Sequence, residues 1–253
     1  MLMNFWFPAV LILGYVHLLF MLAILRKDNS IIDIAWGLGF VLVAWGLYFQ
    51  SPHPNAWSLL IPVSLWGIRL SVYLFIRNRR SGKEDWRYAA WREQWGSWVY
   101  VRAYLQVFLL QGLFMWIISL PLMGSSNLMH FTWLQILGGM IFLTGFLWES
   151  FADAQLLRFK AKTENKGKVM RSGLWRLSRH PNYFGEMLVW WGIFLISISW
   201  VPWYIGILSP LTISGLLWKV SGVPMLEQKY ADNPDYQAYI KSTPALIPSL
   251  KKI

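Results

Sequence analysis

The chain has 253 residues, of which 56% are hydrophobic and only 14% are charged, whereas a soluble domain carries about 25% charged residues. This composition excludes a soluble globular protein and predicts an integral membrane protein. The chain has no cysteine, which excludes disulfides, thiolate nucleophiles and thiolate-bound metals, and we expect no metal site. The net charge of +11 does not predict nucleic-acid binding, because most Lys and Arg residues lie in loops between apolar stretches, as the positive-inside rule requires.

Apolar stretches of about 20 residues, the length that crosses a bilayer, recur from end to end. They predict an all-α integral membrane protein with seven transmembrane helices in a single domain, residues 1–253. The first stretch lacks a basic n-region and a small-residue cleavage site, so we expect a retained span and not a signal peptide. The expected spans are Phe5–Leu25, Ile31–Phe49, Trp57–Ile76, Val101–Leu122, Phe131–Leu156, Tyr183–Trp200 and Trp203–Lys219.

Basic residues alternate between the loops. The segments after the first, third, fifth and seventh spans carry Lys and Arg, and the loops after the other three spans carry none. The positive-inside rule therefore places the N-terminus outside and the C-terminus in the cytoplasm. One basic segment, Lys83–Trp98, mixes charges with aromatic residues and fits either an interfacial amphipathic helix or a solvated loop with aromatic anchors. Within it, Gly82–Tyr88 is interpreted as a loop that either covers a cofactor or pairs its own charges.

Five ionisable residues interrupt the spans near their cytoplasmic ends, and such residues mark functional sites by default. Asp33 begins the second span, and Arg69 lies about two turns, roughly 10 Å, inside the third. Glu149 and Asp153, four residues apart, share one helix face, and Glu186 begins the sixth span. The alternative is structural: a pair between Asp33 and Arg69, or between Glu186 and a loop arginine, holds helices together without any chemistry.

The segment Ser172–Gly192 concentrates donors around a helix start that Pro181 pre-sets. Donors at a helix N-terminus form an anion site, and arginine supplies the forked donors that suit phosphate. This segment contributes Arg179, His180, Asn182, Tyr183 and Glu186. The basic run before it contributes Lys160, Lys168 and Arg171, among others. Together they predict a site for a polyanionic cosubstrate, although positive-inside topology alone also explains a basic run.

The motif RHPNYFGE, Arg179–Glu186, followed by an apolar span and by LEQKY and YQAYIKSTPALIP within Leu226–Pro248, resembles the membrane steroid 5α-reductase and sterol reductase superfamily. The stretches IIDIAWGLGF, LWGIRL, RNR with GKEDWRY, and WESFADAQLLRFK are similar to its bacterial steroid 5α-reductase-like family. This resemblance covers nearly the whole chain. It implies NADPH in a cavity open to the cytoplasm of a bacterial inner membrane, with residues 1–122 on the substrate side and residues 131–253 binding the cofactor.

The resemblance also implies an activity and a set of roles. A lipophilic enone would be reduced at its carbon–carbon double bond, as by a 3-oxo-5α-steroid 4-dehydrogenase. Asn182 and Glu186 match the N-x-x-G-E signature, and Asp153 matches an acidic residue after the fifth span. Glu149 falls where steroid reductases carry an asparagine. Further positions near the cofactor or its phosphates are Lys160, Lys168 and Tyr230.

The resemblance departs at the chemical centre. Steroid reductases polarise the ketone with a glutamate in the second span and a tyrosine in the third, whereas here Asp33 is the acid and the third span offers Arg69 and Tyr73. A neutral carboxyl or a tyrosine hydroxyl in an apolar site can donate to the oxygen on which negative charge develops. We expect Asp33, helped by Tyr73 or Arg69, to be this donor, and the shorter acid does not favour a bulky steroid.

Two other functions fit parts of the chain. Isoprenylcysteine carboxyl and phospholipid methyltransferases share the Arg-His-Pro helix start and a similar tail, which makes S-adenosylmethionine the alternative cofactor. Asn182 after Pro181 and the basic run favour NADPH, because S-adenosylmethionine has no phosphate. A channel or transporter is less favoured, because no internal repeat is visible. The expected partners are a lipophilic small molecule and membrane lipids.

Overall fold

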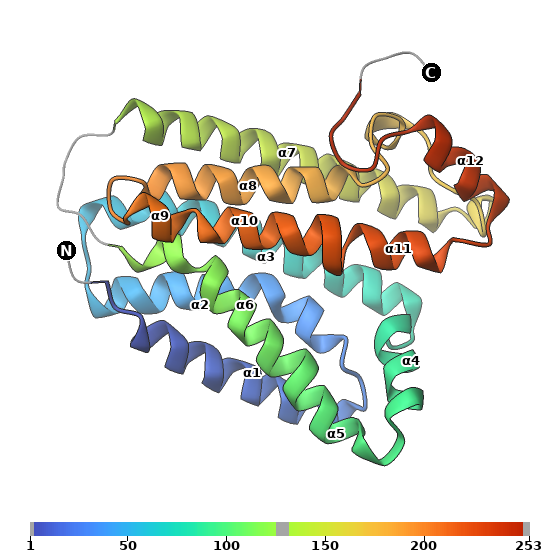
Figure 1. Ribbon diagram of the computed structural model, residues 1–253, viewed down its shortest axis with the longest axis horizontal. Helices are drawn as coiled ribbons and strands as arrows, with labels where there is room; N and C mark the ends of the chain where they lie inside the picture. Colours follow the sequence, from blue (N-terminus) through green and yellow to red (C-terminus); the bar gives the residue numbers. More distant parts are fainter. Residues whose placement is uncertain (1–2, 125–131, 250–253) are drawn as a thin grey trace. The chain divides into compact units, whose positions relative to one another are not determined.

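The computed structural model describes residues 3–124 and 132–249, which form helices and no strand (Figure 1). The predicted all-α class is thus confirmed for the described residues. Phe131, the expected start of the fifth span, lies outside them. Six described stretches are long and apolar enough to cross a membrane: Trp6–Arg26, Ile31–Gln50, Pro54–Ser81, Trp86–Ile118, Trp133–Ala161 and Trp203–Lys229. Helix α8 (Pro181–Ser197), with 17 residues, occupies the place expected for the remaining span.

The chain divides into two compact units. Unit 1 comprises Met1–Thr132 and Ile196–Ser209. Its first three long helices are α1 (Trp6–Arg26), α2 (Ile31–Gln50) and α3 (Trp57–Ser81). Helices α2 and α3 approach backbone to backbone, because a Cβ atom added to Gly37 would lie 2.3 Å from the carbonyl oxygen of Gly67. Small residues at such a crossing are the usual means of close packing between membrane helices.

The rest of unit 1 begins with α4 (Trp86–Trp95), which is followed by α5 (Val99–Arg102), a π-helical segment η3 (Ala103–Leu109), α6 (Leu110–Ile118) and, near Ser209, the short α9 (Trp203–Gly206). The segment Lys83–Trp98, for which the sequence allowed either a helix or a loop, is therefore largely helical. Tyr88, Trp91 and Trp95 lie at helical spacing on α4, and the rings of Trp91 and Trp95 stack with centroids 5.6 Å apart. Tyr88 and Trp95 are buried, which defines the inner face of α4.

Unit 2 comprises Trp133–Leu195 and Pro210–Ile253. Its helices are α7 (Trp133–Ala161), most of α8, most of α10 (Leu208–Gly215), the π-helical segment η7 (Leu216–Val220), α11 (Val223–Lys229) and α12 (Pro234–Ser242). Glycines again set the closest crossing: a Cβ atom at Gly145 would lie 2.6 Å from the oxygen of Gly185, and one at Gly192 would lie 2.5 Å from the nitrogen of Phe142. Helices α7 and α8 are therefore in close contact between residues 138–149 of α7 and residues 185–192 of α8.

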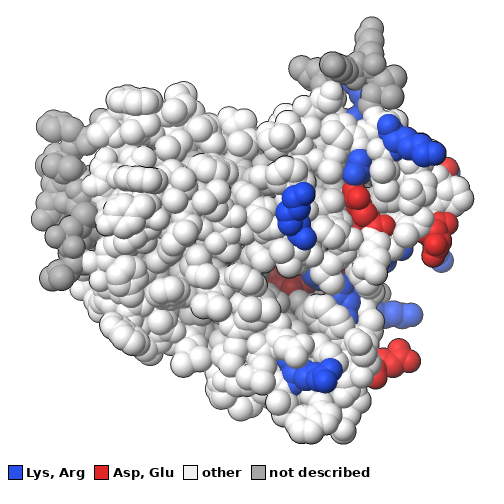
Figure 2. All heavy atoms as spheres, viewed as in Figure 1, with Lys and Arg blue, Asp and Glu red and all other residues white. Residues whose placement is uncertain are grey.

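Large apolar side chains are exposed along the long helices, among them Val10, Ile61, Leu143 and Leu211. Most of the visible surface in Figure 2 is accordingly uncharged. A soluble protein rarely exposes so much contiguous apolar surface. These helices therefore suit a lipid environment, as the composition predicts.

Candidate active site

In unit 1, the carboxylate of Asp33 is held by two residues that follow α3. The Tyr88 hydroxyl donates to Asp33 Oδ1 over 2.6 Å, and Arg87 Nη2 lies 2.5 Å from Asp33 Oδ2. Tyr88 is only 2% exposed, while the side chains of Arg87 and Asp33 are about one fifth exposed. Both carboxylate oxygens therefore have a partner, and the negative charge of Asp33 is compensated by Arg87.

The local sequence explains how Arg87 reaches this position. Asp85 caps the start of α4, where its carboxylate accepts from the backbone nitrogen of Arg87 over 3.1 Å and from Arg87 Nε over 2.8 Å. Aspartate is a favoured residue at this capping position. Burial alone raises the pKa of the Asp85 carboxyl, but its hydrogen bonds and charge interaction with Arg87 outweigh burial and lower the pKa. The Arg87 guanidinium is thus fixed between two carboxylates.

The buried turn between α1 and α2 is joined to the same segment. Glu84 Oε1 accepts from the backbone nitrogen of Asn29 over 2.7 Å, and the backbone nitrogen of Asp85 donates to Ser30 Oγ over 2.7 Å. Arg92, two turns along, pairs with Glu84 at 2.9 Å. These contacts satisfy polar groups of a buried turn, which otherwise cost free energy. The Gly82–Tyr88 segment therefore acts as a clamp that positions α4 against the start of α2.

A further polar side chain reaches the cluster from the next helical run. Gln111 Nε2 donates to the Tyr88 hydroxyl over 3.3 Å. Gln111 is the second residue after the π-helical segment η3, whose wider turns shift the residues after it around the helix axis. Such π-helical turns are frequent at functional sites. We call Asp33, Arg87, Tyr88 and Gln111 the Asp33 cluster.

The other two residues expected around the substrate lie on α3. Arg69 and Tyr73 are one helical turn apart and half-buried. The guanidinium carbon of Arg77 lies 6.0 Å from the centre of the Tyr73 ring. The structure therefore places both residues on one face of α3, whereas the partners it gives to Asp33 are Arg87 and Tyr88.

In unit 2, the expected acidic residues are buried where α7 meets α8. Glu149 and Asp153 are each 2% exposed and Glu186 is 8% exposed. A Cβ atom at Gly185 would lie 2.6 Å from the backbone nitrogen of Glu149, so the helix turn that carries Glu186 lies directly against Glu149. Asp and Glu side chains are almost never fully buried unless they are paired. This crossing is the most acidic buried region among the described residues of unit 2.

Arg179 is the centre of a second network in unit 2. Its Nε and Nη2 atoms donate to Glu227 Oε1 over 3.0 and 2.5 Å, and its Nη1 atom donates to the carbonyl oxygens of Ile240 and Thr243. Its backbone nitrogen also donates to Pro244 over 2.9 Å. Every nitrogen of the guanidinium thus has a protein acceptor. Arg179 anchors the C-terminal tail. Its partner Glu227 is a residue that the sequence analysis did not identify.

His180 lies beside this network. Its Nε2 atom is 3.7 Å from Glu227 Oε1, beyond hydrogen-bond distance, and its ring stacks on Tyr183 with centroids 5.3 Å apart. Burial lowers the pKa of His180, and the neighbouring Glu227 carboxylate only partly offsets this effect. Asn182 and Tyr183 follow Pro181 in the first turn of α8 and are half-buried.

The expected phosphate-binding residues are on the surface of unit 2. Lys160, Lys168 and Arg171 are all exposed. Arg171 donates to the carbonyl oxygen of Asp235 and lies 5.6 Å from the centre of the Tyr239 ring. Tyr230 is half-buried, with its ring 5.1 Å from that of Tyr236. The two lysines therefore present charge to solvent, whereas Arg171 is already joined to α12.

The family described as "Protein of unknown function (DUF1295)" matches residues 19–243. The steroid 5-alpha-reductase DET2 of Gossypium hirsutum is 37% identical over 71 residues, 28% of this chain and 28% of that protein. The steroid 5-alpha-reductase DET2 of Arabidopsis thaliana is 33% identical over 70 residues, 28% of this chain and 27% of that protein. An uncharacterized protein of Schizosaccharomyces pombe is 24% identical over 221 residues, 76% of this chain and 64% of that protein.

No solved structure matches the chain significantly. The alignments with the two plant reductases cover little more than a quarter of the length of each reductase. The predicted resemblance to the steroid 5α-reductase-like family is confirmed. That the chain belongs to the bacterial branch of this family stays a prediction.

Proposed function

This chain belongs to the DUF1295 family, and from that premise we propose that it is an integral membrane reductase of the steroid 5α-reductase type. It uses NADPH to reduce a carbon–carbon double bond conjugated to a ketone in a lipophilic substrate. The observation that carries the proposal is the hydrogen bond of 2.6 Å from the buried Tyr88 hydroxyl to the half-buried Asp33 carboxylate. A hydroxyl donor held by a carboxylate in an apolar helical bundle is suited to stabilise charge on a carbonyl oxygen.

NADPH fits the residues of unit 2 in two respects. The exposed Lys160 and Lys168 suit its phosphates, because they carry positive charge on the segment before the α8 helix start. The buried carboxyls of Glu149, Asp153 and Glu186 suit its hydroxyl and amide donors. Asn182, Tyr183 and Tyr230 complete this side of the site. Arg179 and His180 support the first turn of α8 and the tail that packs against it.

When bound, NADPH would supply the hydride that adds to the β-carbon of the enone. The negative charge that then develops on the carbonyl oxygen needs a donor. The Tyr88 hydroxyl can turn from Asp33 to this oxygen, because Arg87 still neutralises the Asp33 carboxylate at 2.5 Å. The resulting enolate accepts a proton from water at its α-carbon, so the double bond is reduced and the ketone is retained.

The proposal includes a placement in the membrane. Seven spans cross the bilayer, with α8 as the sixth. The N-terminus is outside and the C-terminus is cytoplasmic, because only alternate loops between the spans carry Arg and Lys. The proposed compartment is a bacterial inner membrane, and the site is open to a cytoplasmic cofactor. Residues 1–122 supply the substrate side and residues 131–253 bind the cofactor.

The proposal is tested by the thermal unfolding midpoint of the purified protein in detergent. A ligand that binds only the folded state raises this midpoint by mass action. We expect NADPH to raise it, NADH to raise it less and S-adenosylmethionine to leave it unchanged. The NADPH effect should be reduced in Asn182→Ala. A rise with S-adenosylmethionine alone contradicts the proposal and supports a methyltransferase.

A further inference from the structure

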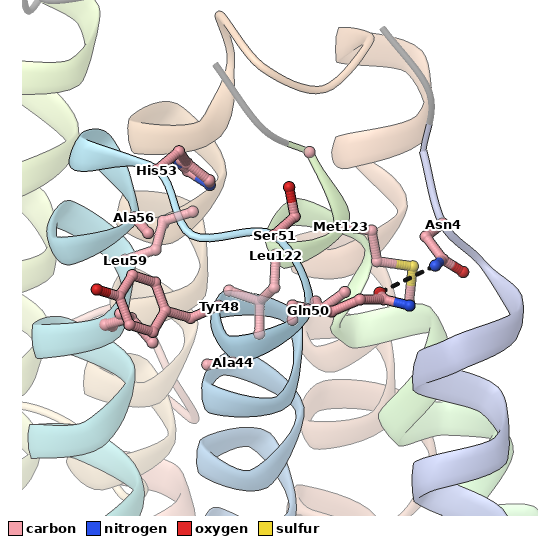
Figure 3. A pocket seen from close by; sticks show the side chains of 13 residues that line it. Asn4, Ala44, Tyr48, Gln50, Ser51, His53, Ala56, Leu59, Leu122 and Met123 are labelled. Carbon is pink, nitrogen blue, oxygen red and sulfur yellow. Dashed lines mark hydrogen bonds between the residues drawn. The ribbon is translucent and has the colours of Figure 1, made fainter. Parts of the chain in front are cut away.

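Unit 1 contains a cavity that is separate from the Asp33 cluster. It has a volume of about 250 Å³ and lies where α2 ends and α3 begins (Figure 3). Gln50, one of its lining residues, is the last residue of α2, whereas Asp33 is in the first turn of the same helix. At 1.5 Å per residue this separation along α2 is about 26 Å. The cavity and the Asp33 cluster are therefore at opposite ends of one membrane-crossing helix.

The lining of the cavity combines uncharged polar residues with apolar ones. The described lining residues include no Asp, Glu, Lys or Arg. Its uncharged polar residues are Asn4, Tyr48, Gln50, Ser51 and His53. Its apolar wall contains the buried side chains of Leu59, Leu60, Leu122 and Met123. Such a lining suits an uncharged amphiphile, because a charged group would lose hydration without gaining a counter-ion.

One polar atom of the lining is unsatisfied. His53 Nδ1 is buried and has no hydrogen-bond partner among the described residues, and the His53 ring lies 6.2 Å from that of Trp200. Asn4 and Gln50, by contrast, are joined across the rim by a hydrogen bond of 3.0 Å, drawn as a dashed line in Figure 3. A buried polar atom without a partner costs about 1–3 kcal/mol. A ligand hydroxyl group would remove this cost if the His53 ring turned to bring Nδ1 to the cavity surface.

We propose that this cavity binds the head of an uncharged lipid that carries hydroxyl or ester groups. The occupant is limited in size, because drug-sized ligands occupy roughly 300–1,000 Å³ and the cavity offers about 250 Å³. It accommodates a glycerol head with the start of its chain, and the rest of the chain lies among the exposed apolar side chains of the helices. The hydrocarbon core of a bilayer is about 30 Å thick, so the end of α2 is at the depth of lipid head groups. This site does not depend on the proposed reductase activity.

The probe is 1-oleoylglycerol, and its matched control is 1-oleoylglycerol phosphate, which has the same chain and an added charge. Native mass spectrometry of the purified protein in detergent counts the bound copies and gives their affinity. Ser51→Trp blocks the exposed mouth of the cavity, and His53→Phe removes the unsatisfied nitrogen while retaining the ring. The matched controls are Ser97→Trp and His17→Phe, which change exposed residues outside the lining.

We expect one tightly bound copy of 1-oleoylglycerol and at least tenfold weaker binding of the phosphorylated lipid. Ser51→Trp should reduce the affinity at least tenfold and His53→Phe severalfold, while both controls bind as the parent chain does. Equal binding of the two lipids, or binding that Ser51→Trp leaves unchanged, would overturn the proposal and leave the cavity to water. Neither result depends on NADPH or on an enone.

Discussion

The Tyr88 hydroxyl donates to Asp33 Oδ1 over 2.6 Å, although the two residues are 55 positions apart in the chain. Arg87 holds the second oxygen of the same carboxylate. The sequence predicted that Asp33 itself donates to the substrate oxygen, whereas this arrangement suggests a different residue for that role. In the proposed site, Asp33 orients the Tyr88 hydroxyl and Arg87 neutralises the Asp33 carboxylate, so that the Tyr88 hydroxyl is the group proposed to donate a hydrogen bond to the substrate.

Replacing Tyr88 tests this division most simply. Tyr88→Phe removes the hydroxyl and keeps the ring, and we expect the rate of enone reduction to fall about 100-fold, the usual effect of removing one donor to a developing oxyanion. The affinity for NADPH should not change. The matched control is Tyr73→Phe on α3, which should keep most of the activity. Full activity in Tyr88→Phe together with its loss in Tyr73→Phe would move the donor to α3.

The ion pair of Arg87 and Asp33 makes a separate prediction about stability. Arg87→Leu leaves the Asp33 carboxylate with one partner fewer in a largely apolar setting, and we expect a loss of about 2 kcal/mol in the free energy of unfolding. Adding Asp33→Asn should restore part of this loss, because no unpaired charge is then left. A double-mutant cycle from unfolding in detergent measures the coupling. Strictly additive effects would show that the pair contributes nothing.

Arg179 and Lys168 are predicted to differ, although both precede α8. Arg179→Gln breaks the contacts to Glu227 and the tail, and because Arg179 is 8% exposed we expect about 3 kcal/mol of lost stability. Lys168→Gln changes an exposed charge, so stability should be unchanged while the affinity for NADPH falls and becomes less sensitive to salt. Thermal midpoints and NADPH titrations at two salt concentrations measure both effects. The assignments fail if Lys168→Gln destabilises the protein and Arg179→Gln does not.

His180 gives the fold a pH dependence. Burial lowers its pKa in the folded state, whereas an unfolded histidine titrates near about 6.5. The unfolded chain therefore binds the extra proton first, so stability is full above about pH 6.5 and falls as the pH drops toward the lowered pKa, by up to about 1.4 kcal/mol per pH unit. His180→Gln should remove this part of the slope. Identical slopes in the parent and His180→Gln would contradict the account.

Residues that stand out in an apolar span could be predicted from the sequence alone. The class of the fold follows from apolar stretches of bilayer length, and Asp33, Glu149, Asp153 and Glu186 are conspicuous because a carboxyl group in such a stretch is costly. The glycine crossings that bury three of these residues could not be located in the same way. Which helices meet at a glycine depends on contacts far apart in the chain.

The partners of those residues could not be predicted for the same reason. Tyr88 is one of several aromatic residues in a mixed segment, and only the capped start of α4 decides that it faces Asp33. Gln111 reaches Tyr88 after a π-helical segment, and this change of register leaves no periodic signal in the sequence. Arg179 was expected near phosphate because arginine before a helix start suits an anion, and that expectation stays a prediction. The protein acceptors of Arg179 that the structure shows, Glu227 and the tail, lie 48 or more positions later.

The central claim is that this chain transfers hydride from NADPH to a conjugated enone. The most direct measurement uses NADPH deuterated at carbon 4 of the nicotinamide, with a panel of lipophilic enones and the purified protein in lipid nanodiscs. Mass spectrometry of the products locates the label. We predict a saturated ketone that carries one deuterium at the β-carbon, formed by the parent chain and about 100-fold more slowly by Tyr88→Phe. Two results would contradict the claim. One is recovery of every enone unreduced and unlabelled, although NADPH stabilises the same protein thermally. The other is a methylated product when S-adenosylmethionine is supplied.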